Sequence, residues 1–295
     1  MKTNKTKIMY VLASGAIAAS LLLGACAKKS DDPVVTPVAE PGAGDIGKAN
    51  LVAHWDFEGS GKEEKSGKMP ASSVNATYSA GAKGQALTLA EGYLLFDELT
   101  ALNTMPSYTV SAWVNVENNG SRPTPFFSLT RQLTGGSTPW DGNINFFAET
   151  FGIGTDTMRV KVYMVTNNNG SSSGQDCLND PSKGGVQAFR GAGKWSHVAV
   201  VWDAATSKFG IYGNAVKISN PEWELRKNGD VPVGAVTFFT PTKVVIGAWG
   251  SNLPGQTAEG WQVPMTGKID ELRVWNKALS PEELTSLYAL ESAGK

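Results

Sequence analysis

The stretch GKIDELRVWNKALSPEELTSLY, residues 267–288, contains the two local patterns that decide the fold. Its first part, 268–275, has the composition and approximate alternation of a half-buried strand. Ser280, followed by Pro281 and then by Glu283, forms a capping box with proline at the first helical position. The apolar face of the predicted helix comes from three leucines, Leu284, Leu287 and Leu290. The stretch therefore predicts a closing strand and one short C-terminal helix.

Upstream of this stretch, the dominant pattern is alternation with a period of two residues. In LVAHWDFE, Leu51, Ala53, Trp55 and Phe57 share one face, which predicts a half-buried strand. Similar patterns predict strands at 108–116, 158–165, 194–202 and 243–249, and a hairpin at 208–218 that turns near Gly213-Asn214. Many strands with turn signals between them are typical of an all-β sandwich or jelly roll.

The composition agrees with an all-β protein and excludes several other classes. The 295 residues include 33 Gly and 9 Trp, and only 18% are charged. The chain has 26 Lys and Arg against 27 Asp and Glu. Because it lacks a basic excess, nucleic acid is not expected as a partner. The 2 Cys cannot build a disulfide scaffold or a multi-cysteine zinc site. We find no internal repeat and expect one domain at 49–295, in which the Asn/Gly/Ser-rich stretch 166–184 is an insertion loop.

The first 48 residues have the features of an export signal and a tether. Residues 1–25 combine a basic start with a short apolar run that ends in small residues, which is typical of a signal peptide. Cys26 follows directly and resembles the lipidated cysteine of bacterial lipoproteins. Residues 26–48 are rich in Pro, Gly and Ala and predict a flexible tether. We expect an exported protein, anchored to the bacterial outer membrane at the cell surface only through a lipid on Cys26; the alternative is an ordinary signal with an incidental cysteine.

Four segments carry a resemblance to a known family: LVAHWDFEGSG (51–61), YTVSAWVNV (108–116), KWSHVAVVWD (194–203) and the stretch 267–288. Together they resemble the LamG-like (laminin G-like) group of the concanavalin A-like lectin/glucanase superfamily, over roughly residues 50–290. The resemblance implies a two-sheet antiparallel β-sandwich of the concanavalin A-like jelly-roll type. We expect the tryptophans inside the matched strands to pack in the core or on a sheet face.

The same resemblance implies a structural calcium ion that joins the end of the first strand to the last strand. Glu58 and Asp270 occupy the matching positions. Calcium prefers carboxylate and carbonyl oxygens, and the Gly59-Ser60-Gly61 turn exposes carbonyl groups. Many family members have Asp where this chain has Glu58, whose side chain reaches further. The alternative is a pair of surface carboxylates without an ion.

The superfamily also contains glycoside hydrolases, which need two carboxylates flanking the scissile bond. Glucanases of this fold have them on one strand as Glu-x-Asp-x-Glu, and that motif is absent. Two acid pairs have i,i+2 spacing, Asp56/Glu58 and Glu222/Glu224, and neither continues to a third acid. One acid pair has i,i+4 spacing, Asp176/Asp180, and it lies in the predicted 166–184 loop, which is too flexible to hold a catalytic pair. We therefore assign no catalytic residue and expect a non-catalytic protein; the less favoured alternative is a glycoside hydrolase whose carboxylates are distant in sequence and converge in space.

The remaining tryptophans lie in predicted loops and point to binding. Sugar rings have apolar faces that pack on flat aromatic rings, and their hydroxyl groups need polar side chains nearby. The candidate ligand-binding residues are Trp140, Asp141, Trp223, Trp249 and Trp261. For each tryptophan, the alternative is that it only pins its own loop to the sandwich.

We therefore expect a surface lipoprotein that binds glycans or polysaccharides, together with other surface proteins of a glycan transport or degradation system. The alternative is a protein–protein adhesion or assembly module of the same fold, because a fold does not determine function.

Overall fold

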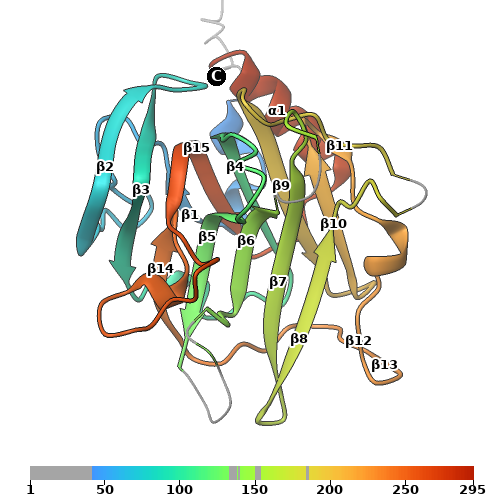
Figure 1. The fold of residues 1–295 in the computed structure, drawn as a ribbon. Helices are drawn as coiled ribbons and strands as arrows, with labels where there is room; N and C mark the ends of the chain where they lie inside the picture. The colour runs from blue at the N-terminus through green and yellow to red at the C-terminus, as the bar shows by residue number, and fades with distance from the viewer. Residues whose placement is uncertain (1–41, 133–137, 139, 150–153, 184–185) are drawn as a thin grey trace, which may run out of the picture. The chain divides into compact units, whose positions relative to one another are not determined.

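The computed structural model describes residues 42–132, 138, 140–149, 154–183 and 186–295 (Figure 1). The predicted signal peptide, Cys26 and the tether up to residue 41 lie outside the described residues. Among the described residues, no helix combines the length and apolar character needed to cross a membrane.

The described chain is built mainly of strands. These are β1 Leu51–Trp55, β2 Ser72–Ala80, β3 Gln85–Asp97, β4 Tyr108–Asn115, β5 Thr124–Arg131, β6 Ile144–Glu149, β7 Arg159–Asn168, β8 Ser171–Leu178, β9 Ser196–Asp203, β10 Lys208–Gly213, β11 Val216–Lys217, β12 Lys227–Asn228, β13 Val231–Pro232, β14 Pro241–Ile246 and β15 Met265–Trp275. The α-helix α1 spans Pro281–Ser292, and short 3-10 turns are η1 Ala43–Asp45, η2 Lys48–Asn50, η3 Thr100–Leu102, η4 Pro221–Trp223 and η5 Gly250–Asn252.

One antiparallel sheet runs in the order β11-β10-β9-β4-β15-β3-β14-β5-β6-β7-β8, with β1 on β15 and β2 on β3. The long strand β3 joins two layers, because Leu87–Ala90 pair with β15 whereas Leu94–Asp97 pair with β14. Between these halves, Glu91 has a left-handed φ of 51°, as a bulge that bends a strand does. The first layer contains β10, β9, β4 and β15, and the second contains β14 and β5 to β8. The predicted all-β sandwich with one C-terminal helix is confirmed.

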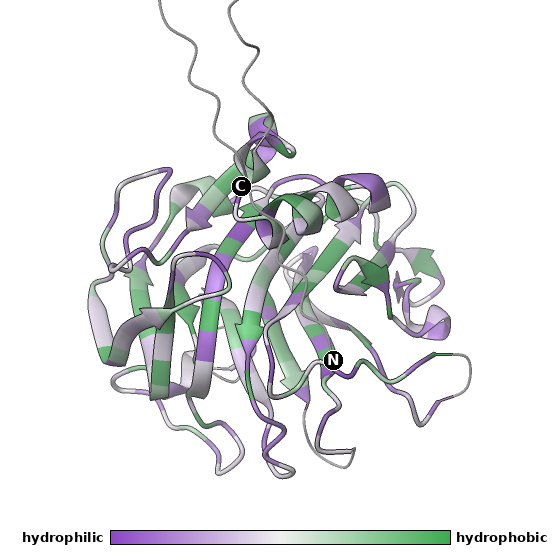
Figure 2. Cartoon of the chain, turned by 90° about the horizontal axis from the view of Figure 1, so that it is seen from above, coloured by the Kyte–Doolittle hydropathy of each residue, from purple (hydrophilic) through white to green (hydrophobic). Residues whose placement is uncertain are grey.

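The main core lies between the two layers. Val110 and Val114 of β4 and Phe146 of β6 are fully buried there, with Trp55 of β1 edge-on to Phe96 at 5.5 Å. Hydropathy alternates along the strands in the same way (Figure 2). The alternation predicted at 108–116 is therefore confirmed. At 51–57, Ala53, Trp55 and Phe57 face the core as predicted. Leu51 does not share their face: the pairing register shifts between Leu51 and Ala53, and Leu51 lies in the outer cluster with α1.

Helix α1 covers the outer face of the first layer. Its capping box is formed as predicted: the Glu283 N–H donates to Ser280 Oγ at 3.2 Å, and the Ser280 N–H donates to Glu283 Oε2 at 2.8 Å. Leu284 and Leu287 are buried against this face, and Ala43 of η1 belongs to the same cluster. Residues 43–48, which the sequence assigned to the tether, therefore belong to the folded domain.

The stretch 166–184 is mainly a hairpin and not the predicted insertion loop. Strands β7 and β8 pair from Lys161↔Leu178 to Asn168↔Ser171. Asn169 and Gly170 have φ values of 52° and 90°, as a tight two-residue hairpin turn requires. The prediction failed because Ser, Gly and Asn have low strand propensity, although here they form an exposed hairpin end. Asp176 consequently lies on a strand, β8.

Candidate functional site

Three of the four predicted loop tryptophans come together in one aromatic cluster. The ring centroids of Trp140 and Trp261 are 5.5 Å apart, and those of Trp249 and Trp261 are 5.4 Å apart. Trp140 and Trp249 lie 6.4 Å apart, and all three pairs meet edge to face. Trp249 is fully buried beneath the other two, which are partly exposed. Edge-to-face contacts of this kind stabilise a fixed arrangement of rings.

The outer face of the second layer supports the cluster. Phe147 of β6 packs on Trp249 at 4.9 Å, and Tyr163 of β7 packs on Trp140 at 5.1 Å. Both supporting rings face outward because Phe146 and Val162, their neighbours in sequence, face the core. The cluster therefore lies on the side of the sandwich opposite to helix α1.

A buried arginine holds the segment that carries Trp140. Arg131, only 3% exposed, donates from Nε to the Asp141 carbonyl at 2.6 Å and from Nη2 to Asp141 Oδ2 at 2.8 Å. Asn145 Nδ2 donates to the Trp140 carbonyl at 3.0 Å. Burial, together with the nearby Asp141 charge, raises the pKa of Tyr163 to about 12. Asp141, predicted as a ligand-binding residue, thus forms an ion pair that positions Trp140.

A network within the segment 249–262 holds the other two tryptophans. The Trp249 N–H donates to Asn252 Oδ1 at 3.0 Å, and Asn252 Nδ2 donates to the Gln262 carbonyl at 2.7 Å. The Glu259 N–H donates to Gln262 Oε1 at 2.8 Å, and the Trp261 indole donates to Glu259 Oε2 at 2.8 Å. The segment therefore presents Trp261 in a defined orientation.

A pocket of about 400 Å³ opens beside the cluster. This pocket, named here the aromatic pocket, is lined by Ser121, Pro123, Trp140, Phe147, Glu149, Lys161, Tyr163, Asp176 and Trp261. Its charged groups lie close together: Lys161 Nζ is 3.4 Å from Glu149 Oε1 and 3.8 Å from Asp176 Oδ2. Aromatic faces beside hydrogen-bonding groups suit a small ligand that has an apolar face and a polar rim.

Trp223 does not join the cluster. It ends the turn η4 and packs, partly buried, against the main core. Trp223 therefore pins its own segment, which was the alternative given for every loop tryptophan.

The sequence did not single out the strand residues of the pocket. Lys161 and Tyr163 lie at alternate positions of the predicted strand 158–165, so they share a face. Glu149 ends β6, and Asp176 lies in the hairpin that was read as a loop. The strand alternation could have shown that Lys161 and Tyr163 share a face. It could not have shown that the loops with Trp140 and Trp261 cover that face.

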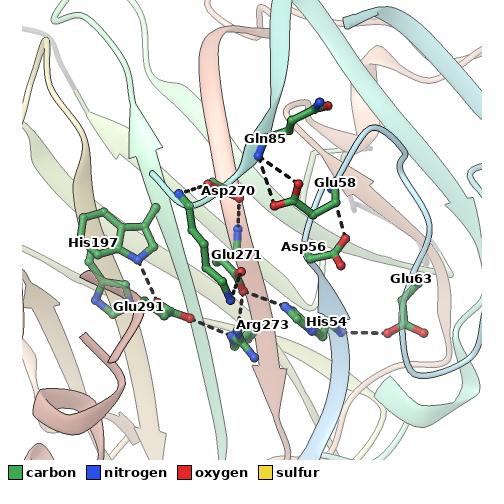
Figure 3. A network of polar contacts seen from close by, with 12 residues as sticks. His54, Asp56, Glu58, Glu63, Gln85, His197, Asp270, Glu271, Arg273 and Glu291 are labelled. Atoms are coloured by element: carbon green, nitrogen blue, oxygen red, sulfur yellow. Dashed lines mark hydrogen bonds and ion pairs between the residues drawn. The ribbon is translucent and has the colours of Figure 1, made fainter. Parts of the chain in front are cut away.

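The two predicted calcium ligands flank the turn between β2 and β3 (Figure 3). Both Glu58 carboxylate oxygens accept the Gln85 N–H, at 3.1 and 3.2 Å. Asp270 accepts the N–H groups of Lys83 at 3.0 Å and Glu271 at 2.8 Å. Burial raises the pKa of Asp270 to about 7, and a nearby cation would favour its charged form.

If a calcium ion binds here, these two residues supply only part of its shell. In the described part of the chain, no group of three or more His, Cys, Asp or Glu side chains is placed to hold a metal. Carbonyl and water oxygens would have to provide the other ligands, as calcium sites allow. The calcium site stays a prediction.

A buried charge network lies next to Asp270 and ties α1 to the sandwich (Figure 3). Glu271 pairs with His54 at 2.9 Å and with Arg273, whose Nε is 2.8 Å from Glu291 Oε1. The Trp113 indole donates to Glu291 Oε2 at 2.8 Å. Burial opposes ionisation of Glu271, but His54 and Arg273 outweigh it and lower its pKa to about 2. Burial raises the pKa of Glu291 to about 7. The network joins β1, β15, β4 and α1.

The fold thus defines a two-layer β-sandwich protein with a pocket on the outer face of one layer. The family model of the concanavalin A-like lectin/glucanases superfamily matches residues 89–285. The chain belongs to this superfamily, and the resemblance inferred from its motifs is confirmed. A search of curated proteins found no match.

Solved structures share the fold at low sequence identity. One is domain 4 of AbnA, a GH43 extracellular arabinanase from Geobacillus stearothermophilus, in complex with arabinotriose: TM-score 0.52, 20% identity, covering 81% of this chain and 98% of that chain. Another is the botulinum neurotoxin serotype C1 binding domain, with TM-score 0.54 and 12% identity, covering 84% of this chain and 53% of that chain. The botulinum neurotoxin DC binding domain, in complex with SialylT, has TM-score 0.51 and 13% identity, covering 83% and 52%. The match thus spans about half of the toxin chains.

Proposed function

We propose that this chain is a non-catalytic carbohydrate-binding protein that holds a glycan in the aromatic pocket. The observation that carries the proposal is the convergence of Trp140 and Trp261, far apart in sequence, beside the carboxylates of Glu149 and Asp176. The rings offer flat apolar faces for a sugar, and the carboxylates accept hydrogen bonds from its hydroxyl groups.

The charge of the pocket favours a neutral glycan. The two pocket carboxylates already have cationic partners: Glu149 and Asp176 pair with Lys161, and Asp176 Oδ1 also lies 3.5 Å from Arg226 Nη2. A uronic or sialic acid would have to compete with these carboxylates for Lys161, and like charges in close contact oppose binding. The superfamily membership and the sugar complexes of the arabinanase and toxin domains support carbohydrate as the ligand class.

The proposal includes display on the cell surface through a lipid on Cys26, beside a glycan transport or degradation system. The described domain starts at Gly42, and η1 packs with α1 on the outer face of the first layer. The aromatic pocket opens on the opposite layer. The first residues of the described domain therefore lie on the side away from the pocket.

The proposal also includes a calcium ion at Glu58 and Asp270, which would join the end of β1 to β15. The support is that both carboxylates face one turn and that Asp270 is buried. Such an ion would act on stability and would leave the aromatic pocket unchanged.

A glycan array tests the proposal. The unlipidated chain, produced without residues 1–25 and with Cys26→Ser, should be retained on neutral polysaccharides, and Trp261→Ala should abolish or strongly reduce retention. Retention on no glycan, together with capture of an envelope or host protein, would favour the adhesion alternative. Release of reducing sugar from a bound glycan would contradict the non-catalytic part.

A further inference from the structure

We propose that the aromatic pocket is one end of a longer groove, so that the chain binds an extended oligosaccharide and not a single sugar ring. This inference rests on the proposed function. The second part of the groove is a cavity of about 510 Å³, named here the polar pocket, whose base contains Leu89 of β3 and Met265 of β15.

The two pockets share their walls. Ser121 and Pro123 line both of them. The segment 261–264 also reaches both, because Trp261 lines the aromatic pocket whereas Val263 and Pro264 line the polar pocket. Two segments from different parts of the sequence thus border both cavities. A chain-like ligand held against Trp261 can continue between these segments into the polar pocket.

The wall that carries Ser121 is fixed by its own hydrogen bonds. Asn119 Oδ1 accepts the N–H groups of Ser121 at 2.8 Å and Arg122 at 2.7 Å. Asn118 Nδ2 donates to the Gly154 carbonyl at 2.8 Å. A preformed wall lowers the entropy cost of binding, because the segment is already ordered before the ligand arrives.

The chemistry of the polar pocket suits further sugar units. Val263 and Pro264, both partly exposed, offer apolar surface, and Asn115, Glu117 and Lys268 offer hydrogen-bond donors and acceptors. No aromatic ring is among its lining residues in the described chain. This pocket therefore contributes by hydrogen bonds to hydroxyl groups, whereas the aromatic pocket contributes by ring packing. Each cavity falls in the range of about 300–1,000 Å³ that is typical of small-ligand sites.

Chain-length dependence tests this inference. Calorimetry would measure Kd for arabinan, xylan, β-glucan and mannan fragments of one to six residues, using the unlipidated chain described above. For the glycan series that binds, Kd should fall as the fragments become too long to fit in the aromatic pocket alone. The double variant Asn115→Ala/Glu117→Ala should weaken the longest fragment about tenfold or more and change the shortest binding fragment less than about twofold. Asp230→Ala, on an exposed turn outside both pockets, is the control.

Each outcome separates the inference from the proposed function. Binding that does not strengthen with length, or a double variant that weakens all fragments equally, would overturn the groove and leave the aromatic pocket as a glycan site. Binding of no fragment of any length would overturn both. A thermal melt of each variant shows whether a loss of affinity is only a loss of folding.

Discussion

Replacing Trp261 with Ala should remove most of the glycan affinity while the sandwich stays folded. Trp261 is partly exposed on the aromatic pocket, and its ring centroid lies 5.5 Å from that of Trp140 and 5.4 Å from that of Trp249. A sugar that covers about 60 Å² of its ring face would gain about 1.5 kcal/mol at roughly 25 cal/mol/Å². That free energy corresponds to about a tenfold increase in Kd, before any shift of Trp140 adds to the loss.

The assay is a calorimetric titration with the glycan that the array identifies, paired with a urea unfolding curve. Trp261→Ala should also lower the free energy of unfolding by about 1–3 kcal/mol, because it removes two edge-to-face contacts. Trp223→Ala is the matched control: Trp223 is also a partly exposed tryptophan in a turn, but it packs on the main core, away from the pocket. It should lower stability and leave Kd unchanged.

Two results would contradict the role of Trp261 in glycan binding. One is a folded Trp261→Ala variant that binds the glycan with unchanged affinity. The other is a Trp223→Ala variant that weakens binding as strongly as Trp261→Ala, since binding would then follow general stability and not the aromatic pocket.

Three further predictions concern stability. If Asp270 binds calcium that is present at about a hundred times its Kd, a chelator should lower the melting temperature by about 5–10 °C. The melting temperature of Asp270→Asn should not respond to the chelator. Equal melting temperatures of the wild type with and without chelator would contradict the calcium site. The pKa of Glu291 is raised from 4.5 to about 7. The stabilisation that this shift provides is therefore fully present below pH 4.5 and is lost as the pH rises through 7. Urea unfolding at pH 5 and pH 8 should therefore show a smaller loss of stability for Glu291→Gln than for the wild type, and an equal or larger loss would contradict this. Ser280→Ala removes the side-chain cap of α1 and should cost about 0.5–2 kcal/mol in urea unfolding; no change would mean that packing of α1 alone determines its stability.

The elements that could be predicted from sequence have strong local signals. The alternation holds over 53–57 because Ala53, Trp55 and Phe57 all lie in the main core. The helix α1 begins where Ser280 and Glu283 cap each other, which is a local interaction. The hairpin at 208–218 turns at Asn214 and Ala215, both with positive φ, so its position was readable from the Gly-Asn signal.

The features that could not be predicted depend on distant contacts. Trp113 faces away from the core, and its burial becomes clear only once α1 covers that face and Glu291 accepts its indole N–H. Strand β8 was hidden by its Ser- and Gly-rich composition. The four loop tryptophans looked equivalent in sequence, because nothing local tells that Trp140 and Trp261 meet over one layer whereas Trp223 packs on the core.

A crystal structure of the chain with its tightest-binding neutral oligosaccharide would test the proposed glycan site most directly. We predict a sugar ring in the aromatic pocket, packed against Trp261 or Trp140, with hydroxyl groups donating to Glu149 or Asp176. An oligosaccharide bound on another surface, with this pocket empty, would contradict the proposed site.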